Sequence, residues 1–269
     1  MSRKAAVLGY PIEHSRSPDL HRAAYRALGL EGWTYERIEC RAGELAGIVD
    51  GLDDAYVGLS VTMPGKPEAL AYATTVTPRA QLVESANTLV RGADGWTADC
   101  TDIDGVTGAL ETVGADFTGG GSAVLLGAGG TARPALAALA AAGADGVVVV
   151  VRDAARARAA LELAEALGLS ARTAGFDAPD LDRTIADAAV LVSTVPAEAA
   201  AGLVDAVATP IRLVDAIYAP WPTPLAARVT ALGGQVAGGL VMLLNQAYRQ
   251  VELFTGQPAP KAAMAAALA

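Results

Sequence analysis

Two charged side chains in the first half of the chain have the types needed to move a proton. Lys66 ends the segment 60–66, directly after an apolar, β-branched run that predicts a strand over 57–62. Asp102 follows a short extended stretch over 96–98 and is expected to begin a helix. A positioned amine can donate a proton to an oxygen that gains negative charge, which accelerates a reaction by about 10²–10⁴-fold. The pair therefore predicts acid–base chemistry, with partial burial tuning the amine.

A glycine-rich turn further along the chain has the pattern of a dinucleotide site. Gly127, Gly129 and Ala132 match G-x-G-x-x-G/A, between a predicted strand over 123–126 and a predicted helix over 132–142. The first glycine allows the tight turn, and the second lets the backbone approach a pyrophosphate at the helix N-terminus. Together with the amine and the carboxylate, this turn predicts an enzyme that transfers hydride.

The residues after the next strand, over 147–151, bear on the choice of nicotinamide cofactor. Arg152, Arg156 and Arg158 are cationic, and Asp153 is the one acid among them. Arginines at this position favour a 2′-phosphate and so NADP, whereas an acid facing the ribose favours NAD. NADP is the prediction, with Arg152 as the main contact. Arg156 and Arg158 as a solvated helix face remain an alternative.

Composition narrows the class of protein. The 269 residues are 52% hydrophobic and 18% charged, with a net charge of −9 and a pI near 4.7. This balance indicates a globular chain and argues against nucleic acid or an anionic membrane as partner. Cys40 and Cys100 form no CxxC pair, which makes a disulfide framework or metal site unexpected. We expect no signal peptide and no membrane span, and therefore a cytoplasmic protein.

Alternating strand and helix patterns predict an α/β fold of two domains. The predicted strands cover 5–8, 34–39, 57–62, 87–91, 96–98, 123–126, 147–151, 189–194, 213–217 and 235–237. The predicted helices cover 18–28, 44–49, 67–73, 78–82, 102–113, 132–142, 155–167, 240–254 and 261–268. We expect residues 1–103, completed by helices in 240–269, to form a substrate domain, and 104–239 to form a Rossmann-like, doubly wound domain.

The loop before the first helix also has polar groups suited to a ligand. Ser17 followed by Pro18 predicts an N-cap and a first helical residue. Alternatively, Ser15 and Ser17 on a loop near a helix N-terminus would bind a carboxylate.

Seven segments, in order along the chain, resemble motifs of the shikimate dehydrogenase family. They are Ser15-Arg16-Ser17-Pro18, Val61-Thr62-Met63-Pro64-Gly65-Lys66, Ala86-Asn87-Thr88, Thr101-Asp102 with Gly105, Gly127-Ala128-Gly129-Gly130 with Arg133, Asp215-Ala216-Ile217-Tyr218 with Pro220, and the stretch 239–246. The resemblance implies reversible, NADPH-dependent reduction of 3-dehydroshikimate to shikimate in aromatic amino-acid biosynthesis.

The resemblance also assigns roles to individual residues. Its catalytic pair is Lys66 and Asp102. The residues it assigns to the substrate are Ser15, Ser17 and Tyr218 for the carboxylate, and Thr62, Lys66, Asn87, Asp102 and Gln246 for the hydroxyl groups. The residues predicted to contact NADP are Gly127, Ala128, Gly129, Gly130, Thr131, Ala132, Arg152, Arg156, Thr194 and Gly239.

The chain departs from the family pattern at two positions. Cys100 stands where the family has asparagine before Thr-Asp, and a thiol is a weaker hydrogen-bonding group than an amide. Val151-Arg152-Asp153 replaces asparagine-arginine-threonine, which bears on the cofactor. Two rivals therefore stay open: a quinate or aminoshikimate dehydrogenase using NAD, and a non-catalytic sensor of dinucleotide and metabolite. A homodimer is one assembly that the chain could form.

Overall fold

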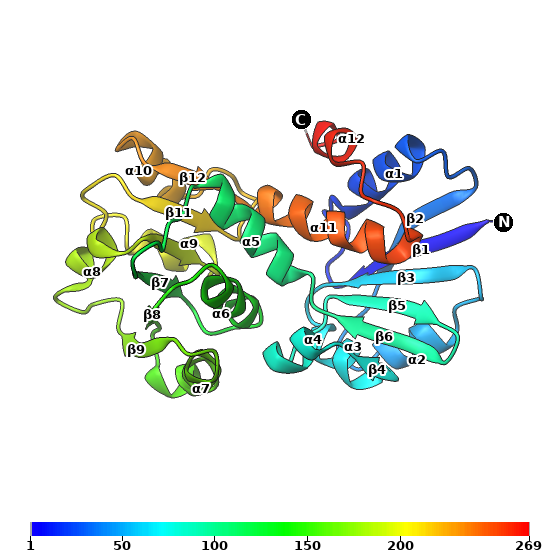
Figure 1. Ribbon diagram of the computed structural model, residues 1–269, viewed down its shortest axis with the longest axis horizontal. Helices are drawn as coiled ribbons and strands as arrows, with labels where there is room; N and C mark the ends of the chain where they lie inside the picture. Colours follow the sequence, from blue (N-terminus) through cyan, green and yellow to red (C-terminus); the bar gives the residue numbers. More distant parts are fainter. Residues whose placement is uncertain (1, 269) are drawn as a thin grey trace. The chain divides into compact units, whose positions relative to one another are not determined.

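The computed structural model of the chain describes residues 2–268, which form two compact units (Figure 1). The first unit contains the residues up to Thr101 and those from Gln246 onward, and the second contains Asp102–Asn245. The chain leaves the first unit at the start of helix α5 (Asp102–Thr112) and returns to it within helix α11 (Gly239–Thr255).

The first unit is built on a mixed six-stranded sheet of order β2-β1-β3-β5-β6-β4. Its strands are β1 (Arg3–Gly9), β2 (Trp33–Glu39), β3 (Tyr56–Val61), β4 (Thr75–Val76), β5 (Thr88–Gly92) and β6 (Gly95–Asp99). Its helices are α1 (Ser17–Ala27), α2 (Leu45–Asp50), α3 (Lys66–Tyr72), α4 (Pro78–Val83), the later part of α11, and α12 (Lys261–Ala266). The strands predicted over 87–91 and 96–98 form a hairpin, because β5 and β6 pair antiparallel across Gly92 and Gly95.

Strand β3 shows how this sheet separates an apolar core from a polar layer. Successive side chains of a strand point to opposite faces. Leu59 and Val61 belong to the apolar core that includes Leu45 of α2 and Ala69 of α3. Ser60 points the other way and bonds to α11. Helix α11 lies directly on this second face, because a Cβ at Gly58 would overlap the ring of Phe254.

The second unit is built on a wholly parallel six-stranded sheet of order β12-β11-β10-β7-β8-β9. Its strands are β7 (Ser122–Leu126), β8 (Gly146–Val150), β9 (Ser170–Ala174), β10 (Val190–Ser193), β11 (Arg212–Asp215) and β12 (Gln235–Ala237). Its helices are α5, α6 (Ala132–Ala141), the 3₁₀ helix η1 (Ala154–Ala157), α7 (Arg158–Ala166), α8 (Leu181–Asp187), α9 (Ala197–Ala201), α10 (Pro224–Ala231) and the first part of α11.

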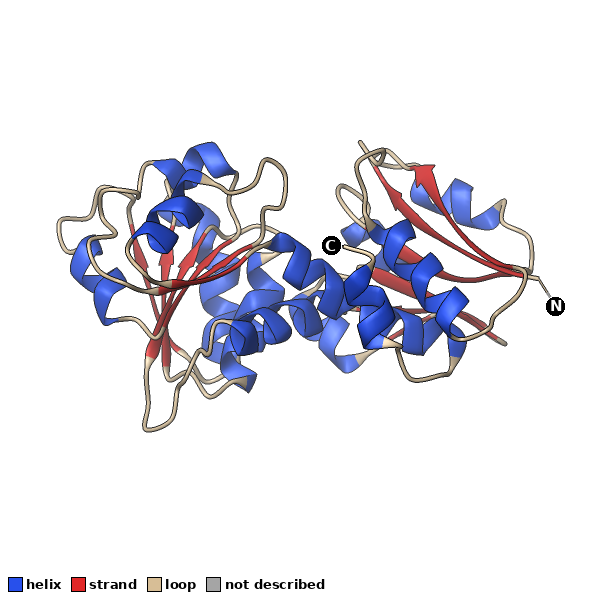
Figure 2. Ribbon diagram, turned by 90° about the horizontal axis from the view of Figure 1, so that it is seen from above, coloured by secondary structure: helices blue, strands red, loops and turns tan. Residues whose placement is uncertain are grey.

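This strand order is that of a doubly wound dinucleotide-binding sheet, as the sequence predicts. The sheet begins at its middle strand β7, runs outward through β8 to β9, and then crosses back to β10. Helices cover both faces of the strands (Figure 2). The apolar strand β8 is buried along its whole length, as expected for a parallel strand covered on both faces.

Five elements were not predicted: β4, β9, α8, α9 and α10. They are short or mostly polar, so neither a period of two nor one of 3.6 is visible. The helix expected over 155–167 begins instead as η1 and continues as α7. Among the described residues, no helix combines the length and the hydropathy required to cross a membrane.

Candidate active site

Six of the predicted substrate residues belong to the first unit, five of them in segments next to strands and the sixth, Gln246, within helix α11. They are Ser15, Ser17, Thr62, Lys66, Asn87 and Gln246. Strands β1 and β3 are parallel, so the segments after them leave from the same edge. Asn87 precedes the antiparallel strand β5, and its carbonyl accepts the N–H of Val61 at 2.7 Å, which brings it to that edge too.

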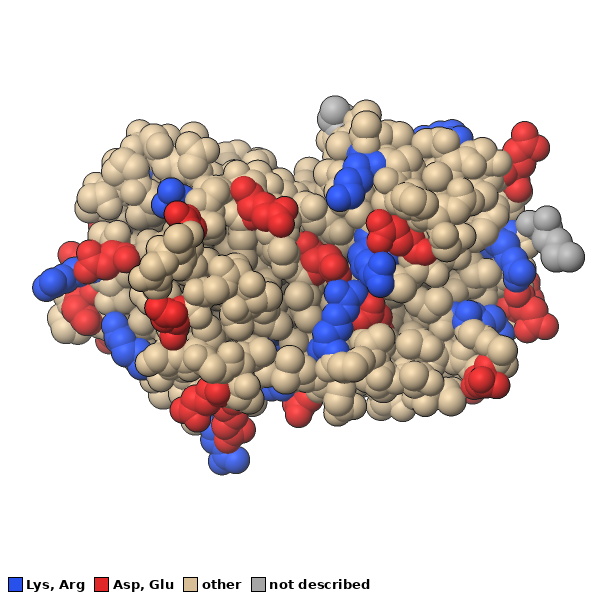
Figure 3. Space-filling view, in the orientation of Figure 1, with Lys and Arg blue, Asp and Glu red and all other residues tan. Residues whose placement is uncertain are grey.

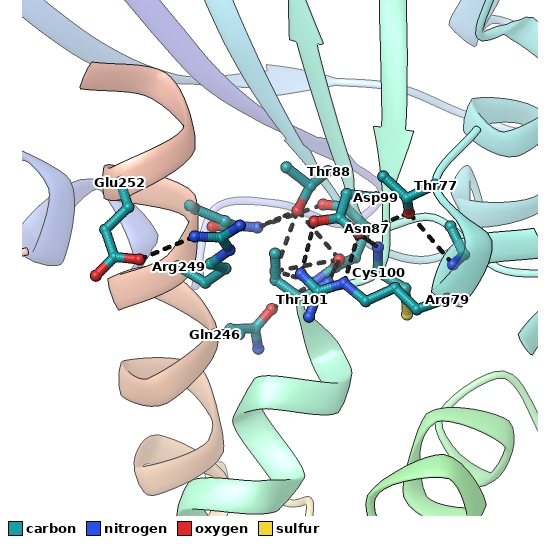
Figure 4. Close-up of polar contacts among 12 residues, drawn as sticks. Thr77, Arg79, Asn87, Thr88, Asp99, Cys100, Thr101, Gln246, Arg249 and Glu252 are labelled. Atoms are coloured by element: carbon teal, nitrogen blue, oxygen red, sulfur yellow. Dashed lines mark hydrogen bonds and ion pairs between the residues drawn. The ribbon is translucent and has the colours of Figure 1, made fainter. Parts of the chain in front are cut away.

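The side-chain amide of Asn87 joins two distant parts of the first unit (Figure 4). Its Oδ1 accepts the backbone N–H of Thr101 at 2.7 Å. Its Nδ2 donates to Oε1 of Gln246 at 2.8 Å, across 159 positions of sequence. Two amides to which the resemblance assigns the substrate hydroxyl groups are therefore in direct contact.

Thr62 and Lys66 are held at the end of β3. The N–H of Thr62 donates to the carbonyl of Leu8 at 2.8 Å, which extends the pairing with β1 by one residue. A Cβ at Gly9 would overlap the methyl group of Thr62, so only glycine allows this approach. Lys66 begins helix α3 and is half-buried. The structure thus places an amine just beyond a strand, as the sequence predicts.

The serine loop differs from the sequence expectation in one respect. Arg16, rather than Ser17, is the N-cap of α1, and no side chain caps this helix. Pro18 is accordingly the second helical residue, and Ser17 is the first. The Oγ of Ser15 accepts the N–H of Ser17 at 3.3 Å, and the carbonyl of Ser15 accepts two bonds from the guanidinium of Arg37, at 2.5 and 3.1 Å. Arg37 of β2 therefore anchors the loop, a role the sequence did not suggest.

A partly buried ion pair anchors the end of β6, just before Thr101. Both Nε and Nη2 of Arg79 donate to the carboxylate of Asp99 at 2.6 Å, and the hydroxyl of Thr77 donates to it at 2.8 Å (Figure 4). The backbone N–H of Cys100 donates a further bond at 2.9 Å. Burial acts to raise the pKa of Asp99, but the hydrogen bonds and charge of Arg79 outweigh it and hold the pKa below its usual range. Asp99 is thus a carboxylate that fixes the turn leading to Asp102.

Removing this ion pair should weaken the fold near neutral pH and matter less in acid. Arg79→Ala leaves Asp99 buried without its cation, and we expect the free energy of unfolding to fall by about 1–3 kcal/mol. Because the pKa of Asp99 is lower in the folded state, its stabilisation is complete above the unfolded value of about 3.9 and is lost as pH falls through the folded value. Urea unfolding of both proteins from neutral to acid pH tests this. Equal midpoints at pH 7, or a gap that widens on acidification, would contradict it.

Asp102 and Tyr218 belong to the second unit. Asp102 is the first residue of α5 and is buried. Tyr218 lies after β11, in a loop organised by the buried Asp215, whose carboxylate accepts the Thr223 hydroxyl at 2.6 Å and the Ile217 N–H at 3.1 Å. Burial raises the pKa of Asp215, against the effect of these two bonds. Gly239 contacts the same loop, since its N–H donates to the Ile217 carbonyl at 3.0 Å.

The predicted cofactor turn lines a cavity of about 250 Å³ in the second unit. Gly127 has φ +95°, and a Cβ there would lie 2.7 Å from Val195 Cγ1, so the turn requires glycine. A Cβ at Gly129 or Gly130 would meet nothing within 4 Å, so the space above this backbone is open. A pyrophosphate requires a tight backbone turn with open space next to it. The turn at Gly127 and the space at Gly129 and Gly130 provide both, so these residues fit a dinucleotide.

The cavity includes six of the ten predicted cofactor residues and several others. The predicted ones are Gly127, Ala128, Gly129, Arg152, Arg156 and Thr194. Val151 and Asp153, which the sequence marks as departures from the family pattern, also line it, together with the unpredicted residues Val150, Phe176, Val195, Pro196 and Ala199. Gly130, Thr131, Ala132 and Gly239 do not line it. Ala132 instead donates its N–H to the Gly129 carbonyl at 3.0 Å, which closes the turn.

Asp153 has a structural role at the rim of this cavity. Its Oδ1 accepts the N–H of Ala155 at 3.0 Å and caps η1. The carboxylate nevertheless remains in the cavity lining with Arg152 and Arg156. In the part of the chain that the structure describes, no three His, Cys, Asp or Glu side chains are grouped to hold a metal ion.

Comparison with known proteins identifies the family. The model of the shikimate dehydrogenase substrate-binding domain matches residues 7–89, and that of the shikimate 5′-dehydrogenase C-terminal domain matches 239–269. The chain is 38% identical to shikimate dehydrogenase (NADP(+)) of Caulobacter vibrioides, over 95% of this chain and 90% of that protein. The chain belongs to the shikimate dehydrogenase family.

Solved structures of the shikimate dehydrogenase family share both units. The crystal structure of Mycobacterium tuberculosis shikimate dehydrogenase has a TM-score of 0.93 and 55% identity, covering 99% of this chain and 98% of that one. Shikimate 5-dehydrogenase of Thermus thermophilus, in complex with NADP(H) and shikimate, has a TM-score of 0.82 and 32% identity, covering 98% of each chain. The α/β fold with a substrate domain and a Rossmann-like domain is thus that of the family.

One buried polar residue near the site, Gln250, is not among the residues predicted from the sequence. Gln250 is 2% exposed and lies one helical turn after Gln246 in α11. Residues four apart share a helix face, so the spacing of the two glutamines was a signal that they act together.

Proposed function

We propose that the chain catalyses the reversible, NADPH-dependent reduction of 3-dehydroshikimate to shikimate, a step of aromatic amino-acid biosynthesis. The chain is an NADP-dependent oxidoreductase that acts on a CH–OH group. The observation that carries the proposal is that the 38% identity extends over 265 residues and so spans both units. The quinate, aminoshikimate and sensor alternatives are not favoured by these relatives.

The substrate carboxylate would be bound by hydroxyl groups. Ser15 and Ser17 are anchored by their loop, and Tyr218 lies on the loop held by Asp215. Hydroxyl groups donate to a carboxylate with charge-assisted hydrogen bonds. Thr62, Asn87 and Gln246 would read the substrate hydroxyl groups, and the Asn87–Gln246 contact supports this shared role.

Lys66 and Asp102 would carry the proton chemistry. When bound, the nicotinamide supplies hydride to the carbonyl carbon in one direction and accepts it in the other. Lys66 donates a hydrogen bond to the carbonyl oxygen, stabilises its developing negative charge and transfers a proton to it. Asp102 would accept a hydrogen bond from the adjacent hydroxyl group of the substrate. In the oxidation of shikimate each transfer runs in reverse.

The cofactor would be held by the second unit. The open backbone at Gly129 and Gly130 lets the pyrophosphate approach the N-terminus of α6. Arg152 and Arg156 would bind the 2′-phosphate, because guanidinium groups pair with phosphate through two parallel hydrogen bonds.

Steady-state kinetics of the wild-type protein test the function. Shikimate and quinate are each oxidised with NADP⁺ and with NAD⁺, and the nicotinamide absorbance is followed. We expect the highest kcat/KM for shikimate with NADP⁺. A higher kcat/KM for quinate would assign the chain to the quinate branch, and the absence of turnover with all four pairs would leave only a binding role.

Changing the charge at the rim of the cofactor cavity should shift the choice of cofactor. Asn caps helices as well as Asp, so Asp153→Asn should keep η1 while removing an anion that opposes the 2′-phosphate. We expect KM for NADP⁺ to fall about 2–5-fold, a range typical of one exposed charge pair. Arg152→Gln should raise it about 10–100-fold, and neither change should alter KM for NAD⁺ comparably. Parallel losses with both cofactors would show that these side chains do not meet the 2′-phosphate.

Location and assembly complete the proposal. Both cysteines are free and buried, which supports a reducing compartment, and we propose the cytoplasm. On the face shown in Figure 3, acidic side chains lie beside most of the basic ones. This pattern fits a small anionic substrate rather than a polyanion. We propose a homodimer as the assembly, which sedimentation analysis would test.

A further inference from the structure

Helix α11 and strand β3 run past each other in register, which sets the level of every polar residue between them. Phe254 lies on Gly58, and Gln250 bonds to Ser60. Four residues of helix advance about 6 Å, and two residues of strand advance about 6.6 Å, so the two steps match. One more step of each brings Gln246 to the level of Thr62. The register of α11 on the sheet thus delivers Gln246 to the edge where Lys66 begins α3.

The polarity of the Asn87 amide is fixed by the backbone. An N–H group can only donate, so the bond from Thr101 N–H at 2.7 Å forces the facing atom of Asn87 to be its oxygen. The opposite atom is then the NH₂ group, which donates to Gln246 at 2.8 Å. The facing atom of Gln246 must therefore be its oxygen. Gln246 consequently keeps its own NH₂ group for a ligand acceptor.

A row of buried hydrogen bonds runs from Tyr35 through Ser60, Gln250 and Thr88 to the side-chain oxygen of Asn87. The hydroxyl of Tyr35 donates to Ser60 at 2.7 Å, and Ser60 donates to Oε1 of Gln250 at 2.8 Å. The Nε2 of Gln250 donates to the Thr88 hydroxyl at 3.0 Å. Thr88 has thus received one hydrogen bond, and its hydroxyl lies 3.1 Å from two groups, the acceptor Asn87 Oδ1 and the Thr101 hydroxyl.

The sheet places these groups on one face. Ser60 and Thr88 are direct partners in the pairing of β3 with β5, so their side chains point the same way, toward α11. Tyr35, Ser60, Thr88 and Gln250 are each at most 5% exposed. Low dielectric surroundings strengthen hydrogen bonds in such rows and penalise any that are left unmade.

The far end of the row is uncharged. His21 lies 3.3 Å from Gln250 Oε1 and stacks on Tyr35, with ring centroids 4.0 Å apart. Burial lowers the pKa of His21 to about 3, against the hydrogen bond with Gln250. Burial also raises the pKa of Tyr35, against its hydrogen bonds with Ser60 and Ser17. The row is therefore neutral at physiological pH, and its direction is set by donors and acceptors alone.

We propose that Thr88 and Gln250 are positioning residues, which lock the Asn87 amide in the orientation that makes Gln246 present its NH₂ group to an acceptor oxygen of the substrate. This inference rests on the proposed function for the roles of Asn87 and Gln246. Without the row, the Asn87 oxygen keeps its bonds from the N–H and the hydroxyl of Thr101 but loses the bond from the Thr88 hydroxyl, and the Asn87–Gln246 pair gains freedom to rotate. The expected consequence is weaker and less well oriented substrate, with cofactor binding intact.

A matched pair of substitutions at Thr88 tests the proposal. Thr88→Val keeps the shape and removes the hydroxyl, whereas Thr88→Ser keeps the hydroxyl. We expect Thr88→Val to lower kcat/KM for shikimate about 10–100-fold, the range seen when a group that orients a ligand-binding side chain is lost. KM for NADP⁺ should stay constant, and Thr88→Ser should stay within about 3-fold of wild type.

Two further variants separate positioning from loss of stability. Gln250→Met interrupts the row at Gln250. If Thr88→Val does not fold, Gln250→Met should still show the loss of kcat/KM for shikimate. Val251→Ala makes a cavity in the same buried part of α11 but removes no hydrogen-bonding group of the row, so it should lower Tm without changing kcat/KM. The proposal is overturned if Thr88→Val and Gln250→Met retain kcat/KM within about 3-fold, or if Val251→Ala loses as much as they do.

A measurement without substrate distinguishes failure of this inference from failure of the proposed function. In the ligand-free protein, NMR should show slow solvent exchange of the Asn87 side-chain NH₂ in wild type and Val251→Ala, and fast exchange in Thr88→Val. Equal exchange in all three overturns the positioning role whatever the reaction. If the exchange differs but Asn87→Ala and Gln246→Ala oxidise shikimate like wild type, the row exists but the proposed substrate contacts are wrong.

Discussion

Replacement of Lys66 by alanine is expected to lower kcat for shikimate oxidation by about 10²–10⁴-fold, the contribution of a positioned general acid–base group. The reason is that the oxygen would lose both its proton partner and its charge stabilisation. Lys66 is a half-buried residue at the start of α3, outside the apolar core of the first unit, so Tm should change little. Binding of NADP⁺ should also be retained. Stopped-flow and steady-state absorbance of the nicotinamide measure the loss.

Two matched variants show whether proton transfer or charge alone is responsible. Lys66→Arg keeps the positive charge but cannot release its proton near neutral pH, so it should remain close to the alanine variant in kcat. Lys4→Ala removes an exposed lysine whose partner is Asp53 and should behave like wild type. If Lys66→Ala keeps kcat within about 3-fold, the amine takes no part in the chemistry. Full activity of Lys66→Arg would instead assign it a purely electrostatic role.

Substitution of Gly129 by valine should abolish productive cofactor binding while leaving the fold intact. A Cβ at Gly129 meets no protein atom within 4 Å, and the residue is exposed, so the added side chain encounters only the space that the pyrophosphate would fill. We expect KM for NADP⁺ to rise at least about 10²-fold, since a close backbone approach is what the second glycine of the turn provides. Calorimetric titration with NADP⁺ and a thermal melt together measure the effect.

Gly47→Ala is the control for this prediction. Gly47 lies in helix α2 of the first unit, is exposed, and likewise has nothing within 4 Å of an added Cβ. Alanine there should stabilise the helix by about 0.5–1 kcal/mol and leave KM for NADP⁺ unchanged. NADP⁺ affinity of Gly129→Val equal to that of Gly47→Ala would mean that the dinucleotide does not lie over this turn.

The parts of the fold that the sequence predicted are those with a strong period or strong punctuation. Strands β7 and β8 are uninterrupted apolar runs, and the hairpin between β5 and β6 has glycine at each end of its turn. Helix α10 also had a signal that was not used. Thr223 accepts the N–H of Ala226, and Pro224 is the first helical residue, which is the usual start of a helix.

Other features depend on contacts that no local pattern encodes. Ser17 has the residue type of an N-cap, yet the helix begins one residue earlier because the Arg16 backbone takes that position. The sequence pattern indicates that Gln250 is a polar position in an amphipathic helix. Its burial depends on the contact of α11 with β3, where Gln250 meets Ser60 and Phe254 meets Gly58. Asp99 is buried, and Arg79 of α4 supplies the cation that pairs with it there.

The candidate site could be predicted as a set of residues but not as a set of interactions. The contact between Asn87 and Gln246 spans 159 positions and follows from the return of α11 to the first unit. Asp153 is a candidate ribose ligand by its position in the sequence, and in the structure its carboxylate caps η1. Both facts depend on the tertiary arrangement, which local spacing constrains only in part.

The stoichiometry of the reductive reaction tests the central claim most directly. Purified protein is mixed with NADPH and 3-dehydroshikimate, the loss of nicotinamide absorbance is followed, and the product is separated by chromatography. The account predicts one shikimate formed for each NADPH consumed, and reversal of the reaction when NADP⁺ and shikimate are supplied. NADPH left unconsumed by a folded protein that binds both compounds would contradict it.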